Sequence, residues 1–427
     1  RNSVLLDAKA DVLVYGMGER AVTELAAALA AGTPIASLTG VRGTVVTTRT
    51  RDAEPSVQLP SLADARTRDG FFTLTKTFET HYRTTPLFQP FAGRFLKHNP
   101  PAEPLTTAAL DAVYDLPFAR APHPRYRGAR IPAFVQIKDS ITSHRGCFGG
   151  CNFCALGQHQ GKTIQSRSSA SIVREIARLA RAPRFGGTIS DIGGPTANMY
   201  GARCARGISD TCRRASCVMP RICPHLQAPQ APVRTLLRAS RAVPGVARVY
   251  VASGVRYDLA LGDDAYIRDL ALYYTGGRLK LAPEHISPHV LRLMNKPDIR
   301  SYEAFQEEFL RVCARSGAQR QIVPYLIVGH PGTTLRDAVE LALYLRRRNL
   351  RLEQIQEFTP TPMTISTCMY FTGRAFPTHT PVHVPKGREI RLQKALAQWY
   401  LPDNRKYVAE ALRAAGASAA AKELLRP

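Results

Sequence analysis

The order of apolar and polar residues predicts alternating strands and helices in the middle of the chain. Apolar runs that predict strands occur at residues 134–142, 188–193, 247–253, 278–283, 321–329 and 353–358. Amphipathic patterns that predict helices include residues 171–180, 302–314 and 335–347. Parallel neighbours need crossover connections, so this alternation predicts an α/β fold with a parallel sheet over residues 133–370. Functional groups are then expected at the carboxyl edge of the sheet.

The regions on either side carry weaker patterns. Residues 11–16 predict a strand, and the stretch that follows, up to Gly32, predicts a helix. One such unit leaves a face of its strand uncovered and the sequence does not begin with Met, so we interpret residues 1–50 as the later part of a doubly wound domain. Residues 51–132 are irregular and rich in Pro, which indicates a linker that wraps the next domain. Residues 371–427 predict a basic, helical extension.

The chain is strongly basic, with a formal net charge of +25 and a pI near 10.1. Such an excess attracts polyanions, so nucleic acid is a candidate partner. Most basic residues are scattered Arg, and no aromatic-rich RNA-binding signature accompanies them, so no motif supports that partner. The sequence contains no apolar run of about 18 residues, and we expect no membrane partner.

The nine cysteines fall into two groups and two single residues. An odd number, in a chain without a signal-peptide pattern, indicates metal ligation in the reducing cytoplasm rather than a disulfide framework. Cys313 and Cys368 stand alone and are interpreted as buried small apolar residues. The two groups therefore carry the candidate chemistry.

The first group lies in SHRGCFGGCNFCALG, directly after the first predicted strand. Cys147, Cys151 and Cys154 have C-x3-C-x2-C spacing, and a tight loop of this kind can aim three thiolates at one [4Fe–4S] cubane. Gly149 and Gly150 let the backbone pass close to it. Three ligands leave one iron open. That iron can chelate S-adenosylmethionine (SAM) and pass an electron to its sulfonium, which yields methionine and a 5′-deoxyadenosyl radical.

Two other interpretations of this triplet stay open. A zinc site would take His144 or His159 as its fourth ligand, although structural zinc usually uses paired C-x2-C knuckles. A redox pair of Cys151 and Cys154 would leave Cys147 unexplained. The spacing favours the iron–sulfur interpretation.

Ordered motifs extend along the chain. They are RGCFGGCNFC (145–154), IQSRS (164–168), ISDIGGPTANMY (189–200), TCRRASCVMPRICPH (211–225), ASGVRYD (252–258), LKLAPEH (279–285) and VPKG (384–387). With these motifs the chain resembles the YgiQ-type radical SAM proteins over nearly its whole length. The resemblance implies a partial (β/α)6 radical SAM barrel, preceded by a domain like those that bind cobalamin. No D-x-H-x-x-G motif is present, so histidine-ligated cobalamin is not supported.

The resemblance also implies where SAM would bind. Gly193 and Gly194 follow the second predicted strand, where radical SAM enzymes typically carry Gly-Gly-Glu. Pro195 replaces the Glu, so a backbone carbonyl would have to accept from the methionine amino group. A tight strand-to-helix turn needs the same glycines, and this second interpretation carries equal weight.

Further candidates lie at the ends of later strands. Arg256 is expected to clamp the SAM carboxylate, and Glu284 to accept hydrogen bonds from the ribose hydroxyls. Either residue would otherwise make an ordinary ion pair on the rim. The remaining candidates for binding SAM are Phe153, Arg167, Ser253 and Gly329.

The second cysteine group lies in an insert at residues 200–230, after the second predicted strand. Its members are Cys204, Cys212, Cys217 and Cys223, with spacings of 8, 5 and 6 that match no common zinc finger. Four thiolates suffice for zinc or for a closed auxiliary [4Fe–4S] cluster. The auxiliary cluster, structural zinc and reduced thiols without metal stay open, and the cluster is favoured.

Together these features predict a radical SAM enzyme whose substrate and catalytic residues are unknown. Cleavage of SAM needs an electron, so a reductant such as flavodoxin or ferredoxin is an expected partner. Methylthio transfer to RNA or protein is a narrower alternative, because the order from LKLAPEH to GHPG is similar to that family. A metal-stabilised RNA-binding module without catalysis is the alternative from another class.

Overall fold

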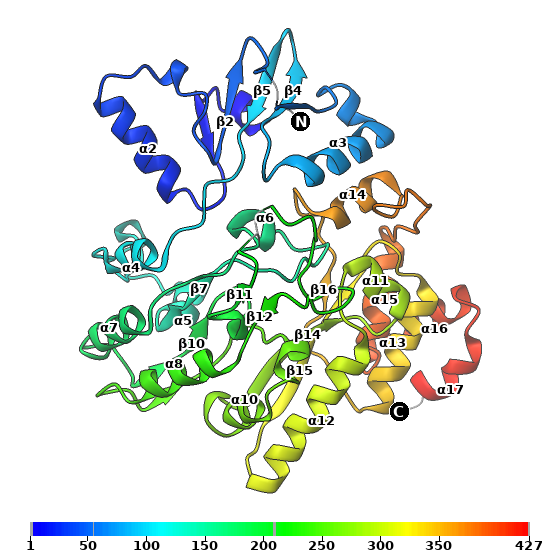
Figure 1. Cartoon of the computed structure of the whole chain (residues 1–427). Coiled ribbons are helices and arrows are strands. Elements are labelled where there is room, and N and C mark those ends of the chain that lie inside the picture. Colours follow the sequence, from blue (N-terminus) through cyan, green and yellow to red (C-terminus); the bar gives the residue numbers. More distant parts are fainter. Residues whose placement is uncertain (1–2, 54, 208–210, 426–427) are drawn as a thin grey trace.

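The N-terminal part of the protein forms a five-stranded sheet. In the computed structural model, which describes residues 3–53, 55–207 and 211–425, the strand order of this sheet is β1-β2-β5-β4-β3. Helix α2 (Glu19–Ala30) packs against β1, and helix α3 (Arg68–His81) packs at the other end, beside β3 and β4. In Figure 1 this domain stands above the rest of the chain. Its strands are β1 (Val12–Val14), β2 (Thr44–Thr48), β3 (Val57–Gln58), β4 (Leu87–Phe91) and β5 (Arg94–His98).

This sheet does not have the doubly wound arrangement expected for residues 1–50. The pairs β1–β2, β2–β5 and β4–β5 are antiparallel, and the pair β3–β4 is parallel. A tight turn joins β4 to β5, where Ala92 and Gly93 have φ values of 42° and 72°. Residues 51–132 supply three of the five strands, so much of the expected linker is part of this domain. The short apolar pairs Leu87–Phe88 and Phe95–Leu96, on either side of the turn at Ala92 and Gly93, were the missed signal.

The middle of the chain forms parallel strand pairs. The pairs are β6 (Ser140–Thr142) with β10 (Asp191–Gly193), β9 (Thr188–Ile189) with β13 (Arg248–Val249), and β14 (Arg278–Glu284) with β15 (Gln321–Val328), which also pairs with β16 (Gln356–Glu357). Helices lie between these strands in the sequence, so the expected α/β fold is confirmed. The closure of the strands into a partial (β/α)6 barrel stays a prediction.

The first strand of this region is shorter than predicted. Residues 134–137 belong to helix α5 (Pro132–Ile137), and the strand begins at Ser140. Proline is favoured in the first turn of a helix, where its missing N–H needs no partner. The side chains of Val135 and Ile137 are exposed, so the apolar run is not a buried strand.

Amphipathic helices cover the parallel strands. Their apolar sides meet strand residues such as Leu281 in one core, to which Ile176 and Phe305 contribute. A capping box formed by Thr334 and Asp337 starts helix α13, which has the predicted limits. The helices that share this core are α7 (Ser169–Ala180), α8 (Ala231–Arg241), α10 (Asp264–Asp269) and α12 (Ile299–Ser316), whereas α13 (Leu335–Arg347) packs in a second core.

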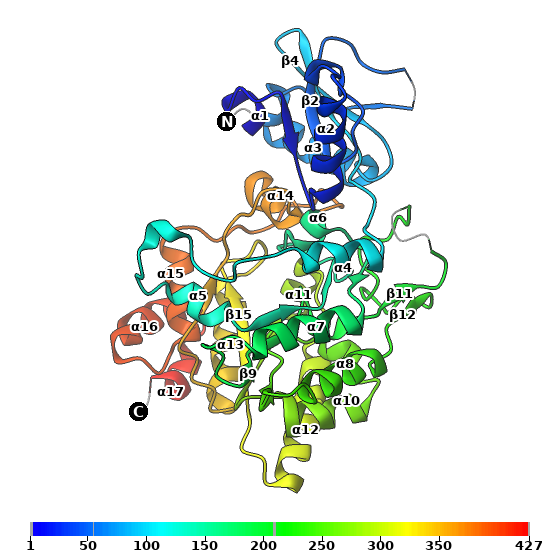
Figure 2. The same cartoon turned by 90° about the vertical axis from the view of Figure 1, so that its left-hand side faces the viewer.

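The C-terminal part is helical and packs on two different regions. Helices α15 (Arg388–Ala397), α16 (Arg405–Ala414) and α17 (Ala421–Leu424) share a second core with α13 and β15. Helix α14 (Ile365–Thr372) instead contacts α3 of the N-terminal domain. In Figure 2, α14 and α6 (Leu156–Gln160) lie between the N-terminal sheet and the parallel strands.

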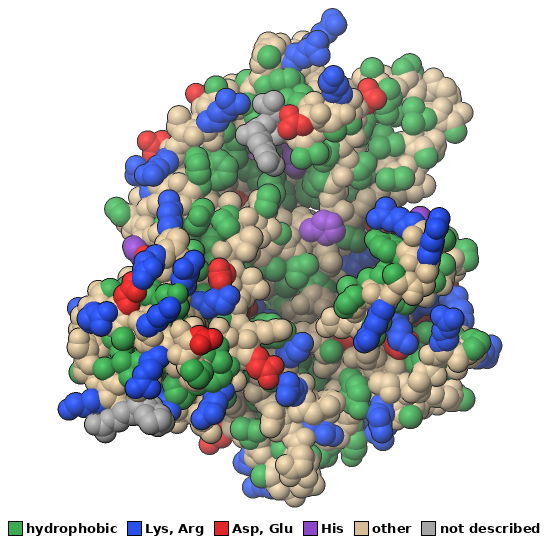
Figure 3. All heavy atoms as spheres, turned by 180° about the vertical axis from the view of Figure 1, so that it is seen from behind, with side chains coloured by type: hydrophobic (Ala, Val, Ile, Leu, Met, Phe, Trp, Pro, Cys, Tyr) green, Lys and Arg blue, Asp and Glu red, His purple; other side chains and the backbone are tan. Residues whose placement is uncertain are grey.

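The surface agrees with the scattered distribution of basic residues in the sequence. On the face shown in Figure 3, Lys and Arg are spread among apolar and acidic side chains. No helix within the described residues is long and apolar enough to cross a bilayer. Further elements are α1 (Val4–Asp7), α4 (Thr107–Asp115), α9 (Tyr257–Ala260), α11 (Pro288–Met294), β7 (His144–Arg145), β8 (Gln165–Ser166), β11 (Arg203–Cys204) and β12 (Leu226–Gln227).

Candidate active site at the cysteine loop

The first cysteine group lies in a loop that two paired strands close. Strands β7 and β8 are antiparallel neighbours, and we call residues 146–164 between them the cysteine loop. Cys147, Cys151 and Cys154 line one cavity, which we call the cysteine cavity. The structure thus brings the predicted triplet together.

Gly149 lies where the candidate ligands meet. A Cβ atom built on Gly149 would lie 3.4 Å from Sγ of Cys147, 3.9 Å from Sγ of Cys151 and 3.1 Å from Nη1 of Arg256. Two thiols and one guanidinium therefore surround a space that glycine leaves free. This set of donors, with a cation beside the sulfurs, fits a cluster bound by thiolates.

Burial keeps these thiols protonated when no metal is bound. Burial raises the pKa of Cys147, and the neighbouring Cys151 increases that pKa further. Burial also raises the pKa of Cys154 to about 11. Metals bind the thiolate form, so loading would have to displace these protons. A cationic metal would stabilise the charge that the buried sulfurs then carry.

The spacing of the donors also bears on a single-ion site. Within the described residues, no three His, Cys, Asp or Glu side chains are grouped closely enough to hold one metal ion. A cubane separates its ligands by its own width, so that observation does not test a four-iron cluster. The choice of metal for the triplet therefore stays a prediction.

The cysteine loop is anchored on one side by the end of helix α11. The backbone N–H of Asn152 donates to Met294 O at 2.9 Å, and its Nδ2 donates to Leu293 O at 2.8 Å. In return, Asn295 Nδ2 donates to Gly150 O at 2.6 Å. Asn295 itself has the left-handed backbone conformation. These bonds fix the backbone between the second and third cysteines and just before them.

The Cys-rich insert holds the loop from another side. Ser216 Oγ donates to Gly149 O at 2.7 Å, and the N–H of Cys217 donates to Phe148 O at 3.0 Å. Gly150 has a φ of 64°, and a Cβ on it would lie 2.6 Å from Ala215 O. The insert therefore packs directly on the backbone that carries the first two cysteines.

Arg256 forms a buried ion pair with Asp258 and also faces the cysteine loop. Its Nε and Nη2 donate to the two carboxylate oxygens of Asp258 at 2.9 and 2.6 Å. Asn198 accepts from the N–H of Arg256 at 2.8 Å and donates to its carbonyl at 3.0 Å. Although burial works against the charged form, Asp258 raises the pKa of Arg256. The guanidinium thus stays charged, with Nη1 directed at Gly149.

Glu284 lies opposite a buried lysine that sequence reasoning missed. Nζ of Lys296 lies 3.8 Å from Oε1 of Glu284 and donates to Ala282 O at 2.5 Å. Burial raises the pKa of Glu284, and Lys296 works in the opposite direction. Although burial disfavours a charged ammonium, Tyr257, Cys151 and Glu284 raise the pKa of Lys296. A single Lys outside the chosen motifs gave no sequence signal for this role.

Gly193 and Gly194 allow close packing at the end of β10. A Cβ on Gly193 would lie 2.3 Å from Ser253 Oγ, and one on Gly194 would lie 2.7 Å from a backbone oxygen. The Gly193 carbonyl accepts from both the N–H and the hydroxyl of Ser143, at 2.7 and 3.0 Å. The hydroxyl of Ser253 donates to Asp191. The tight-turn interpretation therefore accounts for both glycines, and the Gly193 carbonyl already has two donors.

Arg167 does not line the cysteine cavity, and its expected contact with SAM stays a prediction. Its Nη1 donates to Thr142 O at 2.9 Å, and Nη2 donates to Ser171 Oγ at 2.9 Å. The guanidinium also pairs with Glu175 and stacks over the ring of Tyr114, 4.1 Å from its centroid. Arg167 therefore joins the start of α7 to neighbouring segments.

Phe153 and Gly329 also lie outside the residues that line the cysteine cavity. Phe153 packs in a small apolar core with Met294 and Phe358, and so anchors the cysteine loop. Gly329 has a φ of 75°, and its N–H donates to Gln393 Oε1 of α15 at 2.8 Å. The sequence placed Phe153 and Gly329 in the correct motifs. It did not show whether either residue faces the cysteine cavity.

Helix α3 of the N-terminal domain closes the cysteine cavity. It brings Glu79 to the cavity, and Tyr82 and Arg83 follow at its end. Gln158 Nε2 of the cysteine loop donates to Glu79 Oε1 at 2.7 Å. Burial raises the pKa of Glu79 to about 7, against the opposing effects of Arg83 and Gln158. Because the expected domain boundaries separated α3 from this site, the sequence did not identify Glu79.

The second cysteine group is gathered in the insert. Burial raises the pKa of Cys217; the other three cysteines of the group add to this increase, and Lys162 opposes it. The four thiols are therefore close enough to influence one another, and the described cysteines are all free of disulfides. The N–H of Cys223 donates to Cys217 O at 2.7 Å. The metal at this group, if any, stays a prediction.

Comparisons with known proteins identify the family. The family described as Radical SAM N-terminal matches residues 1–140, and a domain of unknown function (DUF3362) matches residues 353–420. A UPF0313 protein of Geobacter sulfurreducens is 50% identical over 100% of this chain and 71% of its own length. One of Methanocella arvoryzae is 45% identical over 96% and 70%, and YgiQ of Escherichia coli K12 is 39% identical over 97% and 66%. The chain belongs to the UPF0313 family of YgiQ-type radical SAM proteins.

Solved structures give weaker matches. A radical S-adenosylmethionine methyltransferase, TsrM from Kitasatospora setae with tryptophan and a SAM analog bound, has a TM-score of 0.49 and 15% identity, over 94% of this chain and 69% of that one. Coproporphyrinogen III oxidase (HemN) from Escherichia coli has a TM-score of 0.34 and 16% identity, over 65% and 52%. Neither similarity says anything about the reaction of this protein.

The first prediction concerns the contact between the cysteine loop and the insert. Gly150→Ala forces a side chain into a left-handed position and against Ala215 O, so we expect a loss of about 1–3 kcal/mol in the free energy of unfolding. Bound iron should fall with it, as measured by anoxic iron analysis. Gly157→Ala is the matched control, because its Cβ would meet nothing closer than 3.4 Å. Equal iron contents in the two variants would contradict this account of the loop.

The second prediction concerns Glu79. Its folded pKa, about 7, is raised from 4.5, so the stability that its protonated form contributes is present at low pH and is lost as the pH rises through about 7. Between about pH 5 and pH 8.5, the wild-type protein should therefore lose more stability than Glu79→Gln. Urea unfolding at both pH values measures the difference. Glu24→Gln, on the exposed side of α2, should behave as the wild type does.

Proposed function

We propose that the protein is an enzyme that cleaves S-adenosylmethionine reductively, using a [4Fe–4S] cluster held by Cys147, Cys151 and Cys154. The observation that carries this proposal is that all three cysteines line one cavity. Two of their thiols also lie with Arg256 around Gly149 in the same loop. When bound, such a cluster supplies an open iron for the amino and carboxylate groups of SAM and an electron for its sulfonium.

The residues around the cysteine cavity supply charge and position. Asp258 and Asn198 hold Arg256 rigidly, so its guanidinium can offset thiolate charge without a cost of reordering. Its free Nη1 is directed toward the same space, and we assign it to a carboxylate of the bound SAM. Glu284 and Lys296 offer one acceptor and one donor at the end of β14, where hydroxyl or carboxylate groups of a ligand could bind.

The walls of the cysteine cavity restrict access of water. Helix α3 covers it from the N-terminal domain, and Met363, Thr364 and Ile365 cover it next to α14. A radical generated there would otherwise react with solvent or protein groups. The two covering segments, α3 with the residues after it and residues 363–365, are far apart in the sequence. The cavity therefore forms only when both segments are folded.

Reductive cleavage consumes one electron, and the chain must receive it from another molecule. We propose a flavodoxin or a ferredoxin as this donor. For nucleic acid as a substrate, the sequence offers net charge and no motif, and the basic residues visible in Figure 3 are scattered rather than gathered in a band. A nucleic-acid substrate is therefore not part of the proposal.

The third prediction tests cleavage. Anoxically reconstituted protein should form 5′-deoxyadenosine from SAM and dithionite, and Cys147→Ala should form none because one cluster ligand is lost. Cys313→Ala is the control, because Cys313 of α12 is buried in the core and does not line the cavity. Liquid chromatography of the products measures the result. Cleavage by Cys147→Ala at the rate of the Cys313→Ala control would exclude the proposed ligand.

For the second cysteine group we propose an auxiliary [4Fe–4S] cluster. The mutual effect of the four thiols on the pKa of Cys217 supports a shared site. The insert packs on the cysteine loop, so a metal there would also hold that loop in place. A closed cluster needs four protein ligands, and this group supplies them.

The fourth prediction is an iron count. Anoxically purified protein should contain about eight irons, and Cys217→Ala should contain about four while still cleaving SAM. Iron and sulfide analysis with Mössbauer spectroscopy measures this. About four irons together with one zinc in the wild-type protein would replace the auxiliary cluster by structural zinc.

A further inference from the structure

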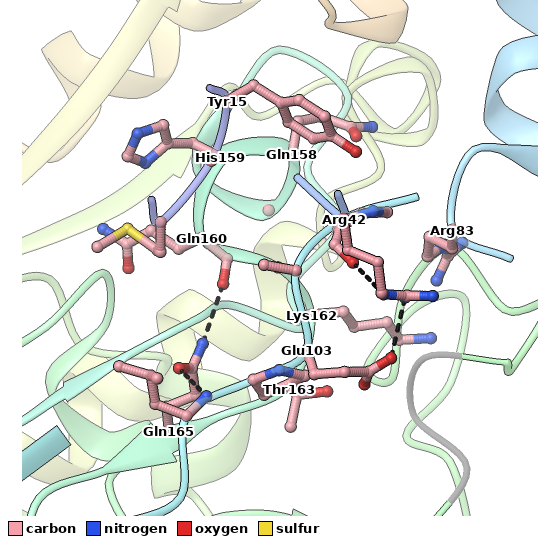
Figure 4. Close-up of a pocket in the computed structure, with 18 of the residues that line it drawn as sticks. Tyr15, Arg42, Arg83, Glu103, Gln158, His159, Gln160, Lys162, Thr163 and Gln165 are labelled. Atoms are coloured by element: carbon pink, nitrogen blue, oxygen red, sulfur yellow. Dashed lines mark hydrogen bonds and ion pairs between the residues drawn. The ribbon is translucent and has the colours of Figure 1, made fainter. Parts of the chain in front are cut away.

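A second cavity lies between the N-terminal domain and the cysteine loop. We call it the basic cleft, and its charged lining consists of Arg20, Arg42, Arg83, Lys162 and Glu103, with His159 on the far side. The close-up in Figure 4 shows Arg42, Arg83 and Lys162 on one side of the cleft, around the carboxylate of Glu103. The proposed radical chemistry does not use these residues.

The two domains are built to meet closely here. Gly16, which follows β1, has a φ of 72°, and a Cβ on it would lie 3.1 Å from His159 O. Gln165 Oε1 at the start of β8 accepts from the N–H of Leu105 at 2.8 Å. The two sides of the cleft are therefore held together by direct contacts between the N-terminal domain and the segment at residues 159–165.

Positive charge in the basic cleft exceeds negative charge. Arg42 pairs with Glu103, Nη2 to Oε1, at 3.0 Å. Among the described residues, the ion pairs of the structure include none to Arg20, Arg83 or Lys162. These three donate instead to backbone carbonyls of Pro104, Cys212 and Arg214.

Glu79 is the second carboxyl group near these cations, because it interacts electrostatically with Arg83. Four cations against at most two carboxylates leave an excess of about two positive charges. A phosphate monoester carries about −1.5 to −2 charges at neutral pH, so it would balance this excess better than a carboxylate would. Arginine and lysine are the usual partners of phosphate oxygens.

The size of the basic cleft limits the ligand. Its volume is about 70 Å³. A cavity needs roughly 10–15 Å³ to hold one water, so this cleft has room for about five to seven waters, enough for a small anionic group such as phosphate. Single-stranded nucleic acid needs an open groove with stacking platforms, and the described lining offers no aromatic side chain other than Tyr15, Tyr82 and His159.

The basic cleft adjoins the cysteine cavity. Tyr82, Arg83, Gly157, Gln158 and Lys162 line both cavities. A ligand held by its phosphate in the cleft would therefore place its remaining atoms next to the three cysteines. We propose that the basic cleft binds the phosphate group of a small phosphate ester, and, resting on the proposed function, that this ester is the substrate class of the enzyme.

Calorimetric titration of the anoxically prepared full chain tests the site. Inorganic phosphate and ribose 5-phosphate should both bind, and Lys162→Gln and Arg42→Gln should each weaken binding by about a factor of ten, because each removes one charge. Glu103→Gln should strengthen binding, since it removes the competing carboxylate. Arg94→Gln is the matched control and should leave the affinity unchanged, because Arg94 is an exposed residue at the start of β5 and does not line the cleft.

The opposite results would overturn the inference. These are no binding of either phosphate compound at millimolar concentration, the same weakening in Arg94→Gln, or weaker binding in Glu103→Gln. Binding of a short single-stranded RNA without binding of ribose 5-phosphate would also overturn it. Tighter binding of the ester than of inorganic phosphate favours a substrate, and equal affinities favour free phosphate as the occupant and overturn the substrate assignment.

The binding test is separate from the test of SAM cleavage. Cys147→Ala should keep the phosphate affinity of the wild-type protein while it loses 5′-deoxyadenosine formation. Phosphate binding by a wild-type protein that cleaves no SAM would leave the site standing and remove the proposed function. Cleavage of SAM without any phosphate binding would support the proposed function and exclude the phosphate site.

Discussion

The candidate active site depends on hydrogen bonds that surrounding segments make to the backbone of the cysteine loop. Apart from short helix α6, this loop has no regular structure to satisfy its own polar groups. Asn152 and Asn295 tie it to the end of α11, Ser216 ties it to the insert, and the N–H of Ser366 donates to Asn152 O at 2.8 Å. Each bond contributes only about 1 kcal/mol, but together they order the three cysteines before any ligand binds.

Two buried ion pairs lie near the cysteine loop, and their contribution to stability does not explain them. Arg256 with Asp258, and Glu284 with Lys296, are removed from water next to the cysteine cavity. Replacing a buried ion pair by apolar groups is often neutral or stabilising, so these pairs are poor stabilising devices. Charged groups with shifted pKa values in a cavity are instead typical of functional sites. Their position beside the thiols agrees with binding of a zwitterionic ligand.

Sequence patterns predicted features that depend on neighbouring residues in the chain. They failed for contacts between side chains that are far apart in the sequence. Helix α13 was predicted at its observed limits, because a capping box and a regular apolar period both mark it. The three loop cysteines also came from local spacing. The contacts of Arg167 with Glu175 and Tyr114 were not predicted, because the partners of a long side chain depend on which helices pack nearby. Lys296 and Glu79 were missed for the same reason. Glu79 reaches the cavity from α3, and Lys296 pairs with Glu284 just after α11, so both come from outside the cysteine motif.

The cysteine cavity is therefore a composite of three parts of the chain. The cysteine loop supplies the thiols, the insert buttresses it, and α3 of the N-terminal domain covers it. Arg83 links the last two, because it follows α3 and its Nη1 donates to Cys212 O of the insert at 3.4 Å. The motif RGCFGGCNFC (145–154) contributes no residue to the lining of the basic cleft. Under the proposed function, the thiols set the chemistry and the cations of the N-terminal domain and Lys162 select the ligand, so a protein with the same thiols and different cations at these positions should select a different ligand.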